Sequence, residues 1–323
     1  MFTSLHALAA LSTGIYFSGL TYFKLAAAEM RPLRGDRPLL LTRELLGSRT
    51  WLAGASVLGV GAAVQVAALT RLSLFQAQPM FLAGLAILLV LAIPVLRERL
   101  TPREWGCVAL LAIATALFAH AASAAPAVQA VQAVQGVSVG HAASAGLTGS
   151  SVTGAAAIAA QPDRALVVAV ALPSLLVPCI GFLTVDLARE GAHARPLTGV
   201  ALAVNAGLLT GTAEMMLTGA AGLGASPRAL LTAPYLYAFA VAAPLALGQL
   251  QIALQRSRLA IVGLVATATA KTYLLIVATT LYGERRPDDG GQTVLALALS
   301  VLAVAAVPHH ERRAARARLQ RVP

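Results

Sequence analysis

The chain has 323 residues, of which 58% are hydrophobic and 11% charged, and its formal net charge is +11 at pH 7. Its mean hydropathy of +0.77 lies far above that of soluble domains, so the composition predicts a protein embedded in a lipid bilayer. A basic protein can also bind nucleic acid, but here the basic residues stand between long apolar runs rather than together on one face. We therefore expect no nucleic-acid partner.

Side chains that hold metals or carry out covalent chemistry are sparse. Cys107 and Cys179 both lie within apolar runs, where a cysteine is usually a small buried hydrophobe. The six histidines are scattered and show no metal-ligand spacing. We find no phosphate-binding loop and no nucleophile beside a base. The sequence therefore predicts no metal site, no cofactor and no enzyme active site.

Nine segments are apolar over the length of about 20 residues that a helix needs to cross a bilayer. In chain order they are approximately residues 4–23, 51–70, 74–96, 105–122, 165–185, 197–219, 229–250, 259–282 and 290–308, with boundaries good to a few residues. The expected fold class is an all-α integral membrane protein with about nine transmembrane helices.

A long linker, residues 24–50, follows the first span and mixes arginines with leucines. We expect it to lie on the inner membrane surface as a short amphipathic helix, with its arginines attracted to anionic lipid. The first span has no basic segment before it and is followed by Lys24. We interpret this span as a retained helix rather than a cleaved signal.

Basic residues fall unevenly on the two sides of the nine spans. Eighteen of the 24 lie on the side of the 24–50 linker and five on the other side, while Lys271 lies within a span. Because cytoplasmic loops are enriched in lysine and arginine, this split predicts a multi-pass protein of the cell (inner or plasma) membrane. Its N-terminus is then outside, and residues 309–323 form a basic cytoplasmic tail.

Residues 123–164 separate the fourth and fifth spans. They carry an Ala-Val-Gln repeat and many glycines and serines, a composition typical of flexible chain. We expect a loop on the outside. A tenth span in this segment would invert every later helix and remove the charge asymmetry, and this alternative stays open.

Residues 65–99 and 251–285 share a pattern. Each segment begins with a glutamine at the end of one span, crosses the next span and ends in Glu-Arg, and the glutamine and glutamate are 33 positions apart in both. The two spans are five apart in the order and so cross the bilayer in opposite directions. Inverted repeats of this kind are typical of secondary transporters. The sequence thus predicts two halves, residues 1–122 and 165–308.

Lys271 places a charge inside an apolar span, in the run ATATAKTYLL. A lysine at the centre of a helix costs about 2.5 to 3.5 kcal/mol on insertion scales and usually faces the bundle interior or a wet cavity. We interpret it as an anchor for an anionic substrate group or as a proton-coupled switch. A structural ion pair is the alternative.

Glu214 is the expected partner of Lys271, because no other acidic residue lies well inside a span. It can take up and release a proton, pair with Lys271, or do both at different stages of transport. The small or polar residues that share its helix face are Gly207, Thr210, Gly211 and Thr218. Small residues in membrane helices commonly allow close packing, so we interpret this stripe as a packing surface.

Further polar side chains complete the candidate set for substrate binding or proton coupling. Glutamines near span ends either bind a polar solute or face interfacial water, and hydroxyls of the first span either line a cavity or bond back to their own helix. Besides Lys271 and Glu214, the candidates are Gln65, Gln78, Gln251, Tyr16 and Asn205.

The run from RTWLAG (49–54) through VAALTRLSLFQAQPMFLAGLAILLVLAIPVLRERLTPREWGCVALLAIATAL resembles the drug/metabolite transporter superfamily. The nine-span layout with its long first linker is most similar to the magnesium-transporter-like branch, and His120 is similar to the histidine that ends the fourth helix there. The resemblance covers residues 4–122 and, more loosely, 229–308. It implies two inverted repeats and a transport function. Superfamily members carry amino acids, sugar derivatives, drugs, nucleotide sugars and divalent cations, so the substrate stays open.

These observations favour a secondary transporter that moves a small polar or anionic metabolite by alternating access. A magnesium or divalent-cation permease is the alternative that the resemblance invites, but magnesium needs several oxygen ligands and one glutamate beside a lysine is a poor cation site. A non-transporting membrane scaffold or a membrane-embedded enzyme is the alternative of another class. The expected partners are a small-molecule substrate and the lipid bilayer, and a homodimer stays open.

Overall fold

The structure, a computed structural model, describes residues 4–33, 38–69, 84, 87–96, 101–102, 104–114, 116–117, 120, 163–187, 196–223, 227–281, 291–292, 294–303 and 305–306. Every regular element in these residues is a helix, so the prediction of an all-α protein is confirmed for this part of the chain. Predictions that concern Gln78, most of the 123–164 loop and the 309–323 tail lie outside the described residues.

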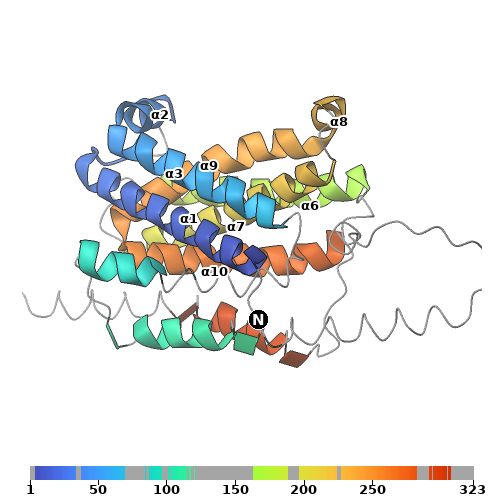
Figure 1. Ribbon diagram of the computed structural model, residues 1–323. Helices are drawn as coiled ribbons and strands as arrows, with labels where there is room; N and C mark the ends of the chain where they lie inside the picture. Colours follow the sequence, from blue (N-terminus) through green and yellow to red (C-terminus); the bar gives the residue numbers. More distant parts are fainter. Residues whose placement is uncertain are drawn as a thin grey trace, which may run out of the picture.

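Two long helices dominate the N-terminal part. Helix α1 covers Ser4–Glu29 and helix α3 covers Arg49–Leu69, and the two pack along each other. Between them lies the short helix α2, Pro38–Gly47, within the linker where an amphipathic helix is predicted. In Figure 1, α2 lies at one end of the bundle and α8 at the other.

The C-terminal part is built from α6 (Arg164–Leu187), α7 (Pro196–Gly222), α8 (Pro227–Thr232), α9 (Pro234–Arg256) and α10 (Leu259–Leu281). Helix α7 occupies the centre, since it packs against α6, α9 and α10 and also contacts α3. Alanine and leucine, both strong helix formers, supply much of these sequences.

Four described helices are long and apolar enough to cross a membrane, at Arg164–Leu183, Thr198–Ala220, Pro234–Arg256 and Leu259–Val277. They overlap the predicted spans five to eight. Shorter apolar helices at Ile87–Leu96, Glu104–Ala114 and Val294–Ala303 overlap predicted spans three, four and nine. Helices α1 and α3, with 26 and 21 residues, are about 39 and 32 Å long. These apolar helices are compatible with a protein embedded in a membrane.

The predicted boundaries of span seven are wrong. Residues 227–232 form the separate helix α8, and α9 begins only at Pro234 and continues to Arg256. Pro234 causes the break, because proline has no amide hydrogen for the preceding turn and is favoured at the start of a helix. The prediction of 229–250 therefore began too early and ended before the last turn and a half.

Helix α6 shows an apolar outer face. The large side chains exposed along it are Leu166, Val168, Leu172, Leu176, Val177, Ile180 and Leu183. An apolar surface of this extent is unusual on a soluble protein and fits contact with lipid. Two prolines, Pro173 and Pro178, lie inside the helix, and the Asn205 side chain of α7 donates a hydrogen bond to the Pro178 carbonyl oxygen (3.2 Å). This bond joins α7 to α6.

Small residues bring the central helices close together. A β-carbon added to Gly19 of α1 would lie 2.9 Å from the backbone nitrogen of Leu58 in α3. One added to Gly211 of α7 would lie 2.9 Å from the Ala270 carbonyl oxygen in α10, and Gly207 packs against the same helix. Close approach of this kind holds helices together in membranes, where lipid is as apolar as the helix surfaces. Gly207 and Gly211 of the predicted stripe thus pack against α10, whereas Thr210 and Glu214 of the same stripe line cavities.

One end of the bundle, which we call the basic end, is where α1 and α9 finish and α3 and α10 begin. There the Lys24 ammonium group donates hydrogen bonds to the carbonyl oxygens of Leu254 (2.7 Å) and Ser257 (2.8 Å), which terminate α9. The Gln255 amide nitrogen donates to the Arg31 carbonyl oxygen (2.9 Å), and its oxygen accepts from the Leu33 backbone amide (2.7 Å). We call these bonds between α1, its following segment and α9 the clasp.

The two ends of the bundle agree with the predicted alternation of the spans. At the basic end Arg258, just before α10, pairs with Glu104 at the start of the fourth predicted span. At the opposite end His120 Nδ1 lies 3.1 Å from Gln292 Oε1, which joins the end of that span to the start of the ninth. Helices α1 and α9 therefore run in one direction, and α3 and α10 in the other.

We expect Gly211→Ala to lower the melting temperature of the detergent-purified protein, because its β-carbon meets α10 backbone that cannot move without separating two helices. Overpacking of this kind costs about 1 to 3 kcal/mol. Gly106→Ala is the matched control, since Gly106 also lies in a helix and no atom lies within 4 Å of its added β-carbon. Equal melting temperatures for the two variants would contradict close α7–α10 packing.

Candidate functional site

The predicted contact between the two intramembrane charges is confirmed. The Lys271 ammonium nitrogen lies 2.6 Å from Glu214 Oε2, and the pair joins α10 to α7. The two side chains are 8% and 17% exposed, so both charges are held away from solvent. A buried charge with a partner at this distance avoids the large cost of leaving either group alone.

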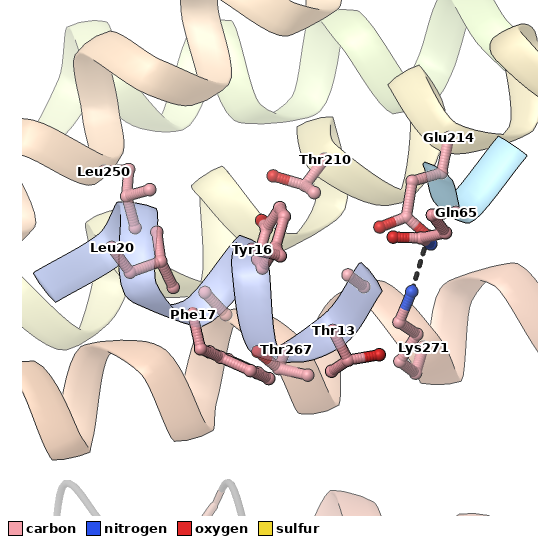
Figure 2. A pocket seen from close by; sticks show the side chains of 12 residues that line it. Thr13, Tyr16, Phe17, Leu20, Gln65, Thr210, Glu214, Leu250, Thr267 and Lys271 are labelled. Atoms are coloured by element: carbon pink, nitrogen blue, oxygen red, sulfur yellow. Dashed lines mark hydrogen bonds and ion pairs between the residues drawn. The ribbon is translucent and has the colours of Figure 1, made fainter. Parts of the chain in front are cut away.

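A small cavity lies beside the pair, between α1, α3, α7, α9 and α10. Its volume is about 30 Å³, which leaves room for one or two water molecules. Figure 2 shows Lys271 pointing toward the Glu214 carboxylate, with the Gln65 side chain next to that carboxylate. The polar residues of its wall are Thr13, Tyr16, Gln65, Thr210, Glu214, Thr267 and Lys271.

A larger cavity, which we call the chamber, adjoins the small one and holds about 240 Å³. Alanine, glycine and leucine residues of α3, α7 and α9 form most of its wall, together with Phe239. Tyr16, Gln65, Thr210 and Glu214 line both cavities, whereas Lys271 lines only the small one. The volume is below the roughly 300 to 1,000 Å³ of drug-sized sites, so the chamber suits a small solute.

The polar groups of the shared wall come from three different helices. Tyr16 of α1 lines both cavities together with Thr210 and Glu214 of α7 and Gln65 of α3. Since Thr210 and Glu214 are one turn apart on α7, they face the same direction. A solute in the chamber therefore meets a phenol, a hydroxyl, an amide and a carboxylate at one place.

Gln65 contributes a free hydrogen-bond donor to this wall. The side chain is 6% exposed, and within the part of the chain that the structure describes its amide nitrogen has no acceptor. A buried donor without a partner costs about 1 to 3 kcal/mol. Because the atom belongs to a residue that lines both cavities, an acceptor oxygen of a solute would satisfy it.

Two other predicted site residues lie elsewhere. Asn205 bonds to the Pro178 carbonyl oxygen and faces Gly181, so it joins α7 to α6 and does not line either cavity. Gln251 is fully buried next to the clasp, where its amide nitrogen donates to the Phe23 carbonyl oxygen (3.1 Å). Of the predicted residues, the structure thus brings together Lys271, Glu214, Gln65 and Tyr16.

Several wall residues were not selected from the sequence. The chamber wall includes Ala55, Gly59 and Ala62 of α3 and Ala243 and Ala246 of α9. Their spacing of three or four positions puts each set on one helix face, and this pattern can be seen in the sequence. It does not by itself predict a cavity, because small residues in membrane helices more often allow close packing.

No protein-family model, curated protein or solved structure matches the chain. The resemblance to the drug/metabolite transporter superfamily therefore stays an expectation. The function has to be argued from the site, because a fold alone does not determine activity.

We expect Lys271→Ala and Glu214→Ala each to lower the melting temperature sharply, because each leaves the opposite charge buried without its partner. Breaking a buried pair in this way costs about 3 to 5 kcal/mol. The double variant removes both charges and should recover most of the loss. Thermal unfolding in detergent measures all three, with Arg228→Ala, an exposed arginine outside the pair, as control. Additive losses in the double variant would show that the two charges do not stabilise each other.

Proposed function

We propose that the chain is a secondary transporter of the cell (inner or plasma) membrane that moves a small polar or anionic metabolite by alternating access. The observation that carries the proposal is the Lys271–Glu214 pair, which lies on the wall of adjoining cavities between α1, α3, α7, α9 and α10. Ionisable residues inside membrane segments usually mark a substrate or ion pathway. Here they stand next to a chamber of suitable size.

Two inverted repeats of a nine-span protein are the architecture proposed for this carrier. In it α1 corresponds to α7, α3 to α9, and the span containing Ile87–Leu96 to α10. Helix lengths support the correspondence, since α1 and α7 have 26 and 27 residues and α3 and α9 have 21 and 23. The packing does as well: α1 packs on α3 as α7 packs on α9. Gly14 of α1 faces Ile87, as Gly207 of α7 faces α10.

The chamber is built from helices of both proposed repeats, as expected for a carrier whose halves rock about a central site. Helices α1 and α3 of the first repeat supply Tyr16 and Gln65, and α7 of the second supplies Glu214. A rocking motion would change the distances between these groups. The clasp holds the same two repeats together at the basic end, which we propose to be cytoplasmic because basic residues concentrate there.

Proton coupling follows from the position of Glu214 between the chamber and Lys271. While the Glu214 carboxylate is charged, it accepts a hydrogen bond from the Lys271 ammonium group. Once protonated, Glu214 no longer neutralises this lysine, and an anionic group of the solute becomes the better partner for it. The Gln65 amide nitrogen then donates to an oxygen of the same solute. Binding of the anion is thereby linked to uptake of a proton, and solute exchange without net proton movement is the other form of coupling open to this site.

A magnesium permease fits the site less well. Magnesium is held by several oxygen ligands, usually carboxylates and waters. In the described part of the chain Glu214 is engaged by Lys271, and the ammonium group would repel a divalent cation. The pair therefore favours an organic solute over a metal ion.

A thermal-shift screen of the detergent-purified protein tests the proposed function. A solute that binds only the folded protein raises the melting temperature according to its concentration over Kd. We expect a polar or anionic metabolite to stabilise the wild type but not the Lys271→Ala/Glu214→Ala double variant, and to be taken up by proteoliposomes only with the wild type. Stabilisation by Mg²⁺ alone, equal in both proteins, would favour the cation permease. Normal uptake by the double variant would show that the pair is only structural.

The clasp provides a separate test of alternating access. We expect Lys24→Met to open the basic end, because it removes two charge-assisted hydrogen bonds to α9. Such bonds contribute about 1.5 to 3 kcal/mol each, so a thiol-reactive probe added from the basic end should reach the chamber about tenfold faster or more. The reporter is Ala246→Cys, a chamber residue, in a protein with Cys107→Ser and Cys179→Ser. Unchanged labelling, as expected for the control Arg228→Met, would contradict a gate at the clasp.

A further inference from the structure

A third cavity lies at the basic end, away from the chamber. It has a volume of about 580 Å³ and is formed where α1 ends, α2 ends and α3 begins. We call it the arginine cavity. Its wall consists of Glu29, Met30, Arg31, Arg43, Glu44, Gly47, Ser48, Arg49 and Thr50.

The three arginines of this wall are available to a ligand. Arg31, Arg43 and Arg49 are all exposed, and none of their guanidinium groups forms an ion pair or hydrogen bond within the described residues. Glu29 is already engaged, because its carboxylate accepts a hydrogen bond from the Thr50 hydroxyl (3.2 Å). With Glu44, the wall has three positive and two negative side chains and so a net charge of +1. One phosphodiester group would neutralise it.

The first turn of α3 adds to the positive potential. Ser48 caps the helix, since its hydroxyl accepts a hydrogen bond from the Trp51 backbone amide (3.2 Å). The N-terminus of a helix carries a partial positive charge, and its first amide groups have no acceptor within the helix. Arginine is the side chain best suited to bind phosphate, because its planar guanidinium group donates paired hydrogen bonds. The chemistry of the wall therefore favours a phosphate over a carboxylate.

Apolar side chains lie beside the arginines. Leu39, Leu40 and Leu46 of α2 are 87%, 47% and 58% exposed, and Leu52 in the first turns of α3 is 40% exposed. Helix α2 has 10 residues and is only about 15 Å long, too short to cross a bilayer. A short helix with exposed leucines next to arginines is typical of segments that lie in the membrane interface.

We propose that the arginine cavity binds the phosphodiester headgroup of an anionic phospholipid, with the acyl chains against the exposed leucines of α2. A free phosphate would explain the arginines but not the leucines beside them, whereas a phospholipid explains both. The cytoplasmic leaflet, which the basic end faces in the proposed topology, is where anionic lipids attract basic segments. The site is separate from the chamber and does not depend on what the protein transports.

Binding at this cavity would also act on the clasp. The Arg31 carbonyl oxygen accepts a hydrogen bond from Gln255 of α9, so the residue that holds the headgroup through its side chain holds α9 through its backbone. A bound lipid restrains Arg31 and with it the segment between α1 and α2. The lipid would thus stabilise the closed basic end.

The experiment titrates the detergent-purified full chain with dioctanoyl phosphatidylglycerol and follows the melting temperature. Dioctanoyl phosphatidylcholine and inorganic phosphate are titrated in parallel. The test variant is Arg43→Gln/Arg49→Gln, and the control is Arg164→Gln/Arg228→Gln, which removes the same charge from exposed arginines outside the cavity. Native mass spectrometry of the same samples counts the lipids that stay bound.

We expect phosphatidylglycerol to stabilise the wild type and the control variant, with phosphatidylcholine and phosphate giving little shift. Removing each arginine should weaken the apparent affinity about fivefold, so the test variant should bind about 25-fold more weakly. Equal shifts with phosphatidylcholine would overturn the proposal, and so would shifts with phosphate equal to those with phosphatidylglycerol. If the test variant melts at a lower temperature without lipid, retention of phosphatidylglycerol equal to that of the control in the mass spectrum also overturns it.

Discussion

The contact between Lys271 and Glu214 is the constraint on which the central bundle depends. Neither charge can remain in an apolar interior alone, so α7 and α10 must be held in the one register that places the two groups 2.6 Å apart. Gly207 and Gly211 make that register possible, because any larger side chain would push α10 away. The ion pair and the close glycine packing thus both fix how α7 packs on α10. Helices α1, α3 and α9 lie around these two helices.

The other polar groups of the site lie around Glu214, on the side of the pair that faces the chamber. Glu214 lines both cavities, whereas Lys271 is reached only through the small one, so the carboxylate stands between the chamber and the ammonium group. Tyr16 and Gln65 approach it from the other proposed repeat. At the basic end Lys24 and Gln255 bond to backbone carbonyl groups, which ties the ends of helices together. The Arg258–Glu104 pair adds a second ion pair there, away from the cavities.

Much of the helical order and part of the site could be predicted from the sequence, for reasons that particular residues make clear. A run of about 20 apolar residues identifies a span, because in a bilayer a single segment can pair its own backbone groups only as a helix. Two isolated opposite charges within spans predict a pair, because each is costly alone. The places of Asn205 and Gln251 could not be predicted, since their partners are carbonyl oxygens of other helices and any residue type supplies those. Pro234 itself indicates a break before α9, but apolar residues on both sides of it make the segment resemble one continuous span.

The interaction that the fold requires is also one that a solute can replace. A lone ammonium group in the bundle is unfavourable, but an anion held at the same place satisfies it as a carboxylate does. In the proposed carrier, protonated Glu214 and a bound anion leave the site with the same net charge as the resting pair. In this proposal the site selects its solute by charge and by hydrogen bonding, because a solute without an acceptor oxygen leaves the Gln65 amide nitrogen without a partner. For this reason a change that merely fills the chamber with apolar atoms could preserve the fold and still prevent transport.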